Sequence, residues 1–513
     1  MPPVNPFLAQ HADDVLGLLN GFDRLRLRGT LRLLANVQGM RTFLWHAGVP
    51  LTDFSSYVQD ITMRVKRATE AVPAAAERPL IYLARPDEPK EQQARAIAQR
   101  DGITEGLICT LKSVEGCWSY DIHRDRAARR LVLVPARRKC LHYYHYFLHP
   151  RVGFMHARLQ SWFPFTLHVC LNGREWLARQ MDAAQLAYRQ RENCFVWLAD
   201  VAAAQALADQ QLRTAWGPLL NAIARQVHPA HAEVLAAYPV PYYWSLEQSE
   251  WASDVLFRSP TALARLYPQL VAHGMQHLGS REVMRFLNKP LPRVGIHGNF
   301  KGEVVTDLAE RPEGVRIKHR VNGNWIKMYD KQGSVLRVET VINDARDLRV
   351  FRRAEGNAQS PKRWRRMRKG VADARRRAVL SQQANMRYLD TMAAVDVHEP
   401  LGTLSRAVCR RVRWQGRSAR ALNPLSAADG ALLAAIYRGE FLIVGFRNRD
   451  LRELHTASTA AAVTRQVRLL RAHGLVRKVS HTHRYTLTAR GRVIVAALLA
   501  ARQADTATLT KAA

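Results

Sequence analysis

The chain has 513 residues, 47% of them apolar, and a formal net charge of +34 at pH 7. This length suggests roughly three domains, and the apolar content excludes a wholly disordered chain. So large an excess of Lys and Arg predicts a polyanionic partner, with nucleic acid first among intracellular polyanions and anionic lipid as the rival.

Several classes of protein are disfavoured by what the sequence lacks. The first residues carry no basic region ahead of an apolar stretch, and no run of 18 apolar residues occurs, so we expect a cytoplasmic protein with no membrane partner. The six cysteines form no Cys-x-x-Cys pair, which argues against a zinc ribbon or finger. No P-loop motif is present, so no nucleotide cofactor is expected.

Residues 1–90 are expected to form a mostly helical N-terminal region. The alternation in Asp23–Arg28 predicts one short strand. Thr52 is predicted to cap a helix that runs from about Asp53 to Glu70. The stretch Val72–Glu91 is rich in Ala, Pro and charge and is interpreted as a linker.

Residues 91–350 are predicted to form a central α+β domain that begins with an aromatic β meander. Its expected strands are Leu107–Leu111, Cys117–His123, Arg130–Val134, Cys140–Leu148, Phe154–Trp162 and Phe165–Leu171. Tyr143, His145 and Phe147 should share one face and His142, Tyr144 and Tyr146 the other. Three interpretations stay open: a sheet packed on both faces, a stacking platform for unpaired bases, or a metal site from His142, His145 and His156.

Residues 200–290 are expected to be mostly helical. Glu247, Glu250 and Asp254 would then span two helical turns, with Glu250 and Asp254 on one face. Carboxylates in so basic a chain are candidates for holding Mg²⁺ or Mn²⁺ at a phosphate. Salt bridges to the many arginines are the alternative.

Residues 314–343 predict three strands, Gly314–Val321, Trp325–Lys331 and Val335–Asn343, joined at Asn322-Gly323 and Gln332-Gly333. The Tyr-Asp-Lys strand end and the following Arg-x-Glu strand resemble a hairpin of plasmid and phage rolling-circle replication initiators. That resemblance implies a nicking or strand-transfer enzyme, transposase-like in chemistry. Tyr329 would be its nucleophile, Lys327 a phosphate contact, and Glu250, Asp254 and Glu339 ligands of Mg²⁺ or Mn²⁺.

The length of the loop between the last two strands decides whether these groups meet. With a two-residue loop at Gln332-Gly333, Lys327 and Tyr329 face away from Glu339. Asp330 and Arg337 would then be diagonal neighbours that form a simple cross-strand pair. A three-residue loop would reverse the faces.

Residues 351–424 are interpreted as a basic helical linker. Residues 349–513 carry 33 Lys and Arg against 10 Asp and Glu, a net +23. Arginine interleaved with an aromatic ring can clamp phosphates and stack a base. The densest run is predicted to contact nucleic acid through Lys362, Arg363, Trp364, Arg365, Arg366, Arg368 and Lys369; an exposed, solvated charge run is the alternative.

Residues 425–503 predict a compact final domain. Its expected elements are a helix Ala427–Tyr437 capped by Ser426, a β segment Phe441–Val444, a helix Arg449–Leu454 capped by Asn448, a helix Ala460–His473 ended by Gly474, strands Val476–Val479 and Arg484–Thr488, and a helix Ala489–Gln503. The helix from Ala460 is amphipathic, with Val463, Val467 and Leu470 at i, i+4 and i+7.

This order of elements resembles the winged helix-turn-helix domain of bacterial MarR-type regulators. The resemblance implies that the helix from Ala460 enters the major groove and that the hairpin loop touches the DNA backbone or minor groove. The residues it implies as DNA contacts are Thr464, Arg465, Arg468, Arg471, His481, His483 and Arg484. A winged helix used as a protein-interaction module is the alternative.

Taken together, the sequence predicts a multidomain α+β protein with antiparallel β meanders and a C-terminal winged helix-turn-helix. We expect a bacterial, cytoplasmic nucleic-acid-binding protein of a mobile element, with metal-dependent nicking as one hypothesis. The other is a non-catalytic regulator that binds DNA or RNA. The sequence leaves open the choice between DNA and RNA for the central domain, the target site and the oligomeric state.

Overall fold

The computed structural model describes residues 5–287, 289, 304–312, 314–346, 348–354, 357, 359–393, 401–438, 441–442, 445–454, 459–479 and 482–503. The chain forms two compact units, each assembled from separate stretches. Unit 1 comprises residues 1–18, 253–339 and 382–513, and unit 2 comprises residues 19–252 and 340–381. The boundaries expected at residues 90, 350 and 424 stay predictions. The architecture is α+β, as the sequence indicates.

Unit 2 is built on a sheet whose strand order is β9-β1-β6-β5-β4-β3-β2. The bounds of these strands are β1 (Val15–Leu31), β2 (Leu80–Tyr82), β3 (Gly106–Asp125), β4 (Arg130–His149), β5 (Gly153–Gln160), β6 (Leu167–Asn172) and β9 (Tyr242–Phe257). The β3–β4, β4–β5, β5–β6 and β1–β6 pairs are antiparallel, and β2 pairs with β3 in parallel. A separate antiparallel pair is formed by β7 (Tyr188–Arg191) and β8 (Cys194–Leu198).

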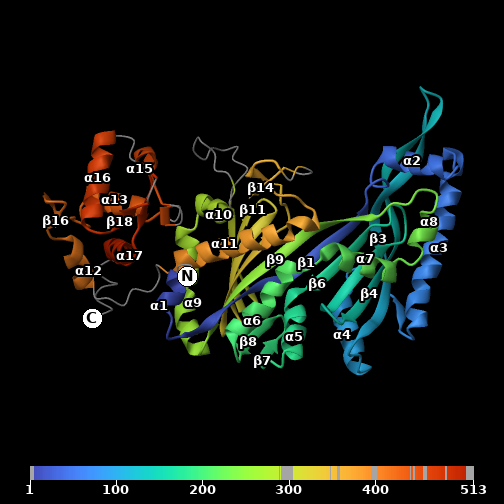
Figure 1. Ribbon diagram of the computed structural model, residues 1–513, viewed down its shortest axis with the longest axis horizontal. Helices are drawn as coiled ribbons and strands as arrows, with labels where there is room; N and C mark the ends of the chain where they lie inside the picture. Colours follow the sequence, from blue (N-terminus) through green and yellow to red (C-terminus); the bar gives the residue numbers. More distant parts are fainter. Residues whose placement is uncertain are drawn as a thin grey trace. The chain divides into compact units, whose positions relative to one another are not determined.

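One face of this sheet is apolar and carries the main core of unit 2 (Figure 1). Leu25 and Leu27 of β1 pack there with Val169 of β6, under side chains such as Val58 and Ile223 of the covering helices. The helical segments of unit 2 are α2 (Val37–His46), η1 (Leu51–Asp53), α3 (Phe54–Ala75), α4 (Lys90–Arg100), α5 (Gly173–Ala183), α6 (Val201–Ala208), η2 (Asp209–Arg213), α7 (Trp216–Val227), α8 (His231–Val234) and η3 (Val371–Asp373). The opposite face is covered by α4 only at one end, around Tyr146 and Phe154.

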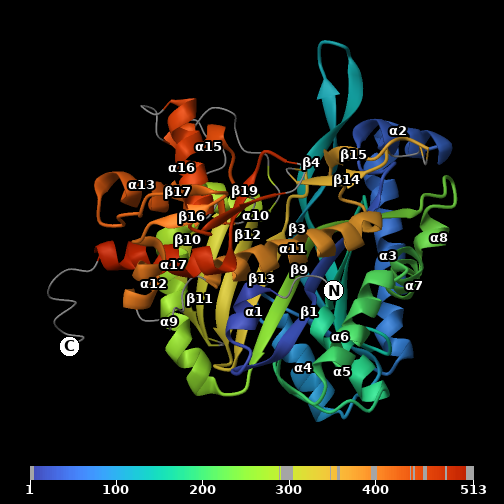
Figure 2. The same cartoon turned by 60° about the vertical axis from the view of Figure 1, so that its left-hand side comes forward.

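Strands β3 and β4 are longer than the sequence predicts. Segments expected as separate strands merge, because β3 and β4 pair without interruption from Cys109 opposite Tyr146 to Asp125 opposite Arg130. Strand β5 pairs with β4 only between His142 and His149. The rest of β3 and β4 therefore continues as a two-stranded arm, whose turn projects from the sheet in Figure 2.

The first 90 residues also depart from expectation. The strand predicted at Asp23–Arg28 is the middle of a 17-residue strand. Helix α3 starts at Phe54, and its N-cap, Asp53, makes no side-chain capping bond, so Thr52 is not the cap. The expected linker from Val72 contains the end of α3, then β2 and the start of α4, because Pro73 is accommodated inside the helix.

Unit 1 contains a sheet of strand order β10-β11-β12-β13-β9. Its strands, besides β9, are β10 (Val304–Arg311), β11 (Gly314–Val321), β12 (Asn324–Lys331) and β13 (Val335–Ile342). The β11–β12 hairpin at Asn322-Gly323 is confirmed, with Val321 opposite Asn324. The helical prediction for residues 200–290 is wrong at β9, whose carboxylates lie on a strand and not on helical turns.

Helices cover this second sheet. They are α1 (Pro6–Gln10), α9 (Pro260–His277), α10 (Ser280–Phe286) and α11 (Ala374–Met392). Helix α9 packs on β11 and β12, and the Tyr267 hydroxyl donates to the carbonyls of Val315 and Met328. Tyr388 of α11 reaches His319 of β11, with 3.0 Å between the hydroxyl oxygen and Nε2.

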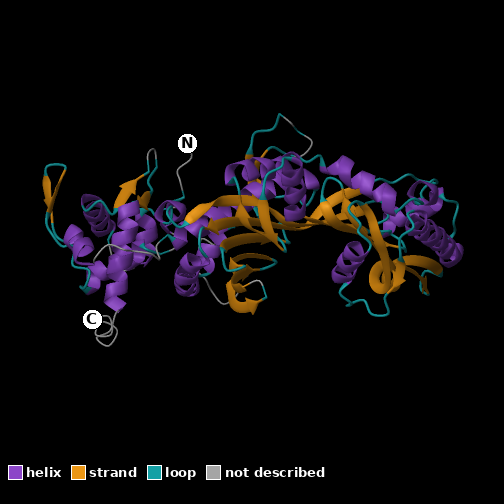
Figure 3. Cartoon of the chain, turned by 90° about the horizontal axis from the view of Figure 1, so that it is seen from below, coloured by secondary structure: helices purple, strands orange, loops and turns teal. Residues whose placement is uncertain are grey.

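The C-terminal domain (residues 401–503), also in unit 1, has its own apolar core. Its elements are α12 (Leu401–Val408), β16 (Val412–Trp414), β17 (Arg417–Ala419), α13 (Ala427–Ile436), α15 (Asn448–Leu454), α16 (Ala460–Ala472), β18 (Val476–Lys478), β19 (Tyr485–Leu487) and α17 (Ala489–Gln503). Figure 3 shows it beside the C-terminal label as helices with short strand pairs. The expected strand at Phe441 is wrong: Phe441 and Leu442 are helical, residues 443–444 lie outside the described part, and the β contact is a bridge from Phe446 to Tyr485.

The segment expected as a basic helical linker begins with strands. Strands β14 (Arg349–Arg352) and β15 (Arg363–Arg366) pair antiparallel, with Phe351 opposite Trp364. Helix structure resumes only at η3 and α11.

Two helical glycines of unit 2 give a stability prediction. A Cβ on Gly39 of α2 would lie 1.9 Å from the Leu33 carbonyl oxygen, whereas one on Gly217 of α7 would meet nothing within 4 Å. Gly39→Ala should therefore destabilise unit 2 by roughly 1–3 kcal/mol through overpacking, and Gly217→Ala should stabilise it by about 0.5–1 kcal/mol. Urea unfolding of both variants measures this; equal effects would contradict the close approach at Gly39.

Candidate nucleic-acid interface

Helix α16 presents one apolar and one basic side, as its sequence predicts. Thr459 caps it by accepting a hydrogen bond from the Ala462 amide. Val463, Val467 and Leu470 are buried in the core of the C-terminal domain. Arg465 and Arg468 lie on the exposed side and have no ion-pair or hydrogen-bond partner among the described residues. Their guanidinium groups are therefore free to bind an anion.

The other two predicted contacts on α16 are partly engaged within the domain. The Thr464 hydroxyl donates to the Ala460 carbonyl and accepts from Asn448 Nδ2 at 3.1 Å, which ties α16 to α15. The Arg471 guanidinium lies over the Trp414 ring, 4.9 Å from its centroid. These contacts leave Arg465 and Arg468 as the best-placed anion ligands of this helix.

The hairpin after α16 is formed as predicted. Gly474 has φ +68°, the left-handed conformation that ends a helix, and Val476 pairs with Leu487. His483 is exposed and Arg484 is half-buried, while His481 lies outside the described residues. Arg477 and Lys478 of β18 are also exposed. The sequence prediction did not include these two as contacts, although both lie within the expected strand Val476–Val479.

The pair of strands β14 and β15 forms what we call the basic ribbon. Arg349 lies opposite Arg366, and Phe351 opposite Trp364, so these four side chains share one face. The two rings are 57% and 60% exposed, with 5.8 Å between their centroids. Val350 on the other face is buried. Phe351 lies before the densest basic run, in the short stretch Arg349–Arg352, which shows no polar–apolar alternation that would have marked it as a strand.

Like charges directly opposite each other on a sheet repel. Arg349 and Arg366 are both exposed, and neither has an acidic partner among the described side chains. An anion bound between them would relieve that repulsion. Exposed aromatic rings beside it offer faces on which bases can stack.

The residues of the predicted run Lys362–Lys369 differ in exposure. Lys362, Arg363, Trp364 and Arg366 are exposed, whereas Arg365 and Arg368 are half-buried. Arg368 donates to Asp373, with 3.1 Å between Nη2 and Oδ1. Burial would raise the pKa of Asp373, but the hydrogen bonds from Arg368 hold it below its ordinary value. Arg368 therefore has a structural role through its ion pair with Asp373. Lys369, the next residue, is exposed.

The Tyr-Asp-Lys hairpin has a three-residue loop, because β12 ends at Lys331 and β13 begins at Val335. The expected two-residue register is therefore wrong. Lys327 lies on the same face as Glu339, and its Nζ is 2.7 Å from Glu339 Oε1. Burial would raise the pKa of Glu339, but Lys327 and Arg337 hold it below its ordinary value. Lys327 and Glu339 thus form a structural ion pair.

Tyr329 is buried, with 6% of its surface exposed. A tyrosine that attacks a DNA phosphate has to reach the surface. The catalytic arrangement predicted from the initiator resemblance is consequently wrong: its nucleophile is enclosed, and its phosphate-binding Lys327 is already paired.

The acidic residues of β9 differ in burial and in the cationic groups that they contact. Glu247 lies 3.1 Å from His168 Nδ1 and 3.5 Å from Arg28, and Glu250 is buried. Asp254, fully buried, accepts from Arg337 Nε at 2.6 Å and from its Nη2 at 2.9 Å. Asp254 and Glu339 each hold a cationic side chain, so the salt-bridge alternative accounts for these two predicted metal ligands. Mg²⁺ or Mn²⁺ binding stays a prediction.

The aromatic meander is packed on both faces over most of its length. Tyr143 and His145 are fully buried on the side of the main core, and Tyr146 is buried under α4 on the other. Tyr146 lies opposite His156, so His142 and His156 share a face from which His145 points away. A site formed by His142, His145 and His156 is therefore excluded. Burial lowers the pKa of both His145 and His156 to about 3.

The chain matches no protein-family model, no curated protein and no solved structure. None of the helices in the described part of the chain has the length and apolar character that a bilayer-spanning helix needs.

The buried Asp254–Arg337 pair gives a second stability prediction. Arg337→Met would leave the Asp254 carboxylate buried without its bidentate partner, at a cost of about 3–5 kcal/mol. As control, Arg346→Ala removes an exposed partner of Asp344 and should cost less than about 1 kcal/mol. Urea unfolding compares them; a loss under 1 kcal/mol in Arg337→Met would show that the pair is dispensable.

Proposed function

We propose that this protein binds nucleic acid. The observation that carries the proposal is the outward face of the basic ribbon, where Phe351 and Trp364 stand exposed beside the Arg349–Arg366 pair. A pair of arginines next to a pair of rings can contact a phosphate and the adjacent bases of an unpaired strand. The net charge of +34 would attract any such polyanion at long range.

The C-terminal domain supports duplex DNA as the partner. Its order of elements around α15, α16 and the β18–β19 hairpin resembles that of a winged helix-turn-helix, in which the second helix of the pair enters the major groove. Arg465 and Arg468 stand one turn apart on the exposed side of α16. A guanidinium group there can bind guanine O6 and N7 or a phosphate.

We therefore favour a DNA-binding protein, placed in the cytoplasm, that also holds an unpaired strand through the basic ribbon. The nicking reaction is left out of this proposal because its tyrosine is buried. A protein-interaction role for the winged helix is disfavoured because the exposed side of α16 is arginine and not apolar.

Single-strand binding should depend on the ribbon rings. Trp364→Ala should weaken binding of a fluorescent single-stranded oligonucleotide by about 5- to 150-fold, the range for loss of one stacked base. Trp45→Ala is the matched control, because Trp45 of α2 is 76% exposed and lies outside the ribbon. Fluorescence anisotropy measures both affinities. Equal affinities in the two variants would contradict a stacking role for Trp364.

Duplex binding should depend on α16. Each of Arg465→Ala and Arg468→Ala should lower affinity for duplex DNA, and loss of one phosphate contact should reduce the slope of log K against log salt by about 0.9. A variant that contacts a base would instead weaken binding mainly to the preferred sequence.

The control for the α16 variants is Arg100→Ala, which removes an exposed arginine of unit 2 that is paired with Asp101. Its duplex affinity and salt slope should stay at those of the parent protein. Unchanged binding in both α16 variants would count against the winged-helix assignment and would leave the ribbon prediction standing.

A further inference from the structure

Unit 2 holds an open cleft of about 620 Å³, lined by residues from both faces of its sheet. It opens where β3 and β4 run on past the last residue of β5, Gln160, which pairs with His142. Beyond that point β3 is the one strand that pairs with β4 in the described part of the chain. A cavity of this size is in the range of small-molecule sites.

The cleft is lined by three guanidinium groups, those of Arg28, Arg137 and Arg158, and by no carboxylate among the described residues. Glu247 and Glu115 lie behind Arg28 and Arg158, at 3.5 and 3.4 Å. Each guanidinium has five N–H donors, so a single long ion pair leaves donors unused. The Nε of Arg28 is buried and has no acceptor among the described atoms. The lining is therefore suited to an anionic group.

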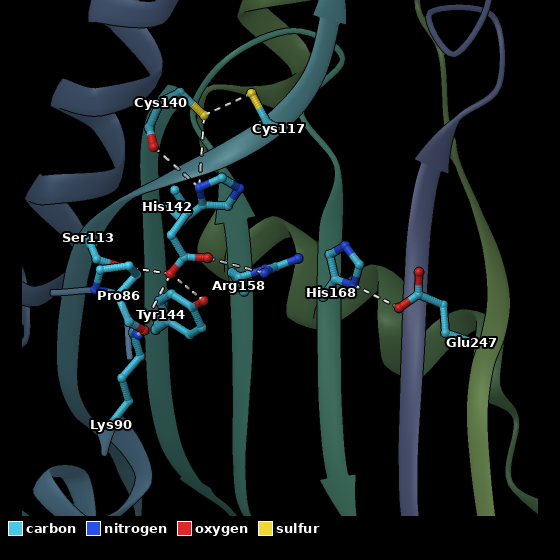
Figure 4. Close-up of polar contacts among 11 residues, drawn as sticks. Pro86, Lys90, Ser113, Cys117, Cys140, His142, Tyr144, Arg158, His168 and Glu247 are labelled. Carbon is cyan, nitrogen blue, oxygen red and sulfur yellow. Dashed lines mark hydrogen bonds and ion pairs between the residues drawn. The ribbon is translucent and has the colours of Figure 1, made fainter. Parts of the chain in front are cut away.

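His142 contributes a hydrogen-bond acceptor. Its Nδ1 lies 3.3 Å from the Cys140 carbonyl oxygen, and only a protonated nitrogen can donate to that oxygen (Figure 4). Burial, reinforced by Arg158, lowers the pKa of His142 to about 4, so the ring is neutral at pH 7. The other ring nitrogen, Nε2, then carries a lone pair. This side chain can accept an N–H from a ligand, which the arginines cannot.

The hydroxyl of Ser119 also favours a bound ligand. Its side chain is 96% buried and lines the cleft, yet its hydroxyl has no hydrogen-bond partner among the described residues. A buried hydroxyl without a partner is costly. A ligand that offers a donor or acceptor there would satisfy it.

Trp118 supplies a flat apolar surface at the same cleft. Its ring is 60% exposed, and the Arg137 guanidinium lies 5.2 Å from the ring centroid. An aromatic ring beside an arginine is a common platform for a nucleobase.

We propose that the unit 2 cleft binds a nucleoside phosphate, either free or as one unpaired nucleotide of a strand. The phosphate contacts the arginines, the base stacks on Trp118, and His142 accepts an N–H of the base. The site is separate from the basic ribbon and from α16, so it does not rest on the nucleic-acid binding proposed above.

The test uses the full-length protein and three probes: adenosine monophosphate, a six-residue single-stranded oligonucleotide and inorganic phosphate. Cys117 lines the cleft, and the hydrogen bond from Cys140, together with Arg138, lowers its pKa, so its rate of alkylation by iodoacetamide reports occupancy. A probe that fills the cleft should slow alkylation of Cys117 and leave the exposed Cys409 unchanged. Titration of each probe gives its affinity.

Ser119→Ala is the variant least able to perturb folding, because the hydroxyl has no partner to lose. It should keep the unfolding midpoint of the parent and weaken nucleotide binding by about three- to tenfold, as for one lost hydrogen bond. Trp118→Ala should weaken it further, while Trp45→Ala and Trp364→Ala should leave protection of Cys117 unchanged.

Protection by the monophosphate identifies a free nucleotide as ligand, and protection by the oligonucleotide alone identifies a strand. Inorganic phosphate that protects Cys117 as well as the monophosphate does would overturn the role given to the base. Failure of all three probes would overturn the site. Arg465→Ala and Arg468→Ala should not alter protection of Cys117. Loss of duplex binding in these variants and loss of nucleotide binding at the cleft are therefore distinguishable outcomes.

Discussion

Successive side chains of a β-strand point to opposite faces, and burial of one face decides what the other can carry. In β1, Leu25 and Leu27 enter the main core of unit 2, so Arg24, Arg26 and Arg28 are turned to the opposite side. The strand register extends this polar face across the sheet, because Arg28 lies opposite His168, which in turn lies opposite Arg158. The basic cleft is thus a consequence of the same alternation that builds the core.

The basic ribbon obeys the same constraint on a smaller scale. Val350 is buried on one face of β14, which turns Phe351 outward beside Arg349. In α16 the period is helical, and burial of Val463, Val467 and Leu470 leaves Arg465 and Arg468 at the surface. Three surfaces rich in arginine therefore arise from periodicity alone, without any special backbone geometry.

The sequence predicts the helices from Ala427 onward to within a few residues, because their caps and helical periods are local signals, as at Ser426 and Gly474. It fails at β9, where Ser249–Phe257 is buried on both faces and so shows no alternation to distinguish a strand from a helix. It fails again at the β12–β13 loop, because one extra residue reverses every face that follows. The position of the predicted site depended on these two non-local features.

The positions of the Asp and Glu side chains decide which Lys and Arg side chains are available to bind a ligand. With 43 Asp and Glu against 77 Lys and Arg, at least 34 cations have no acid of their own, and buried acids such as Asp254 and Asp373 pair with one or more of the others. Asp373 takes Arg368 and Arg376, and Asp254 takes Arg337, so these arginines hold the fold together. The arginines of α16 and of the ribbon face lie where no described acid reaches them. A bound polyanion would relieve their mutual repulsion, so ligand binding would also raise the local stability of these surfaces.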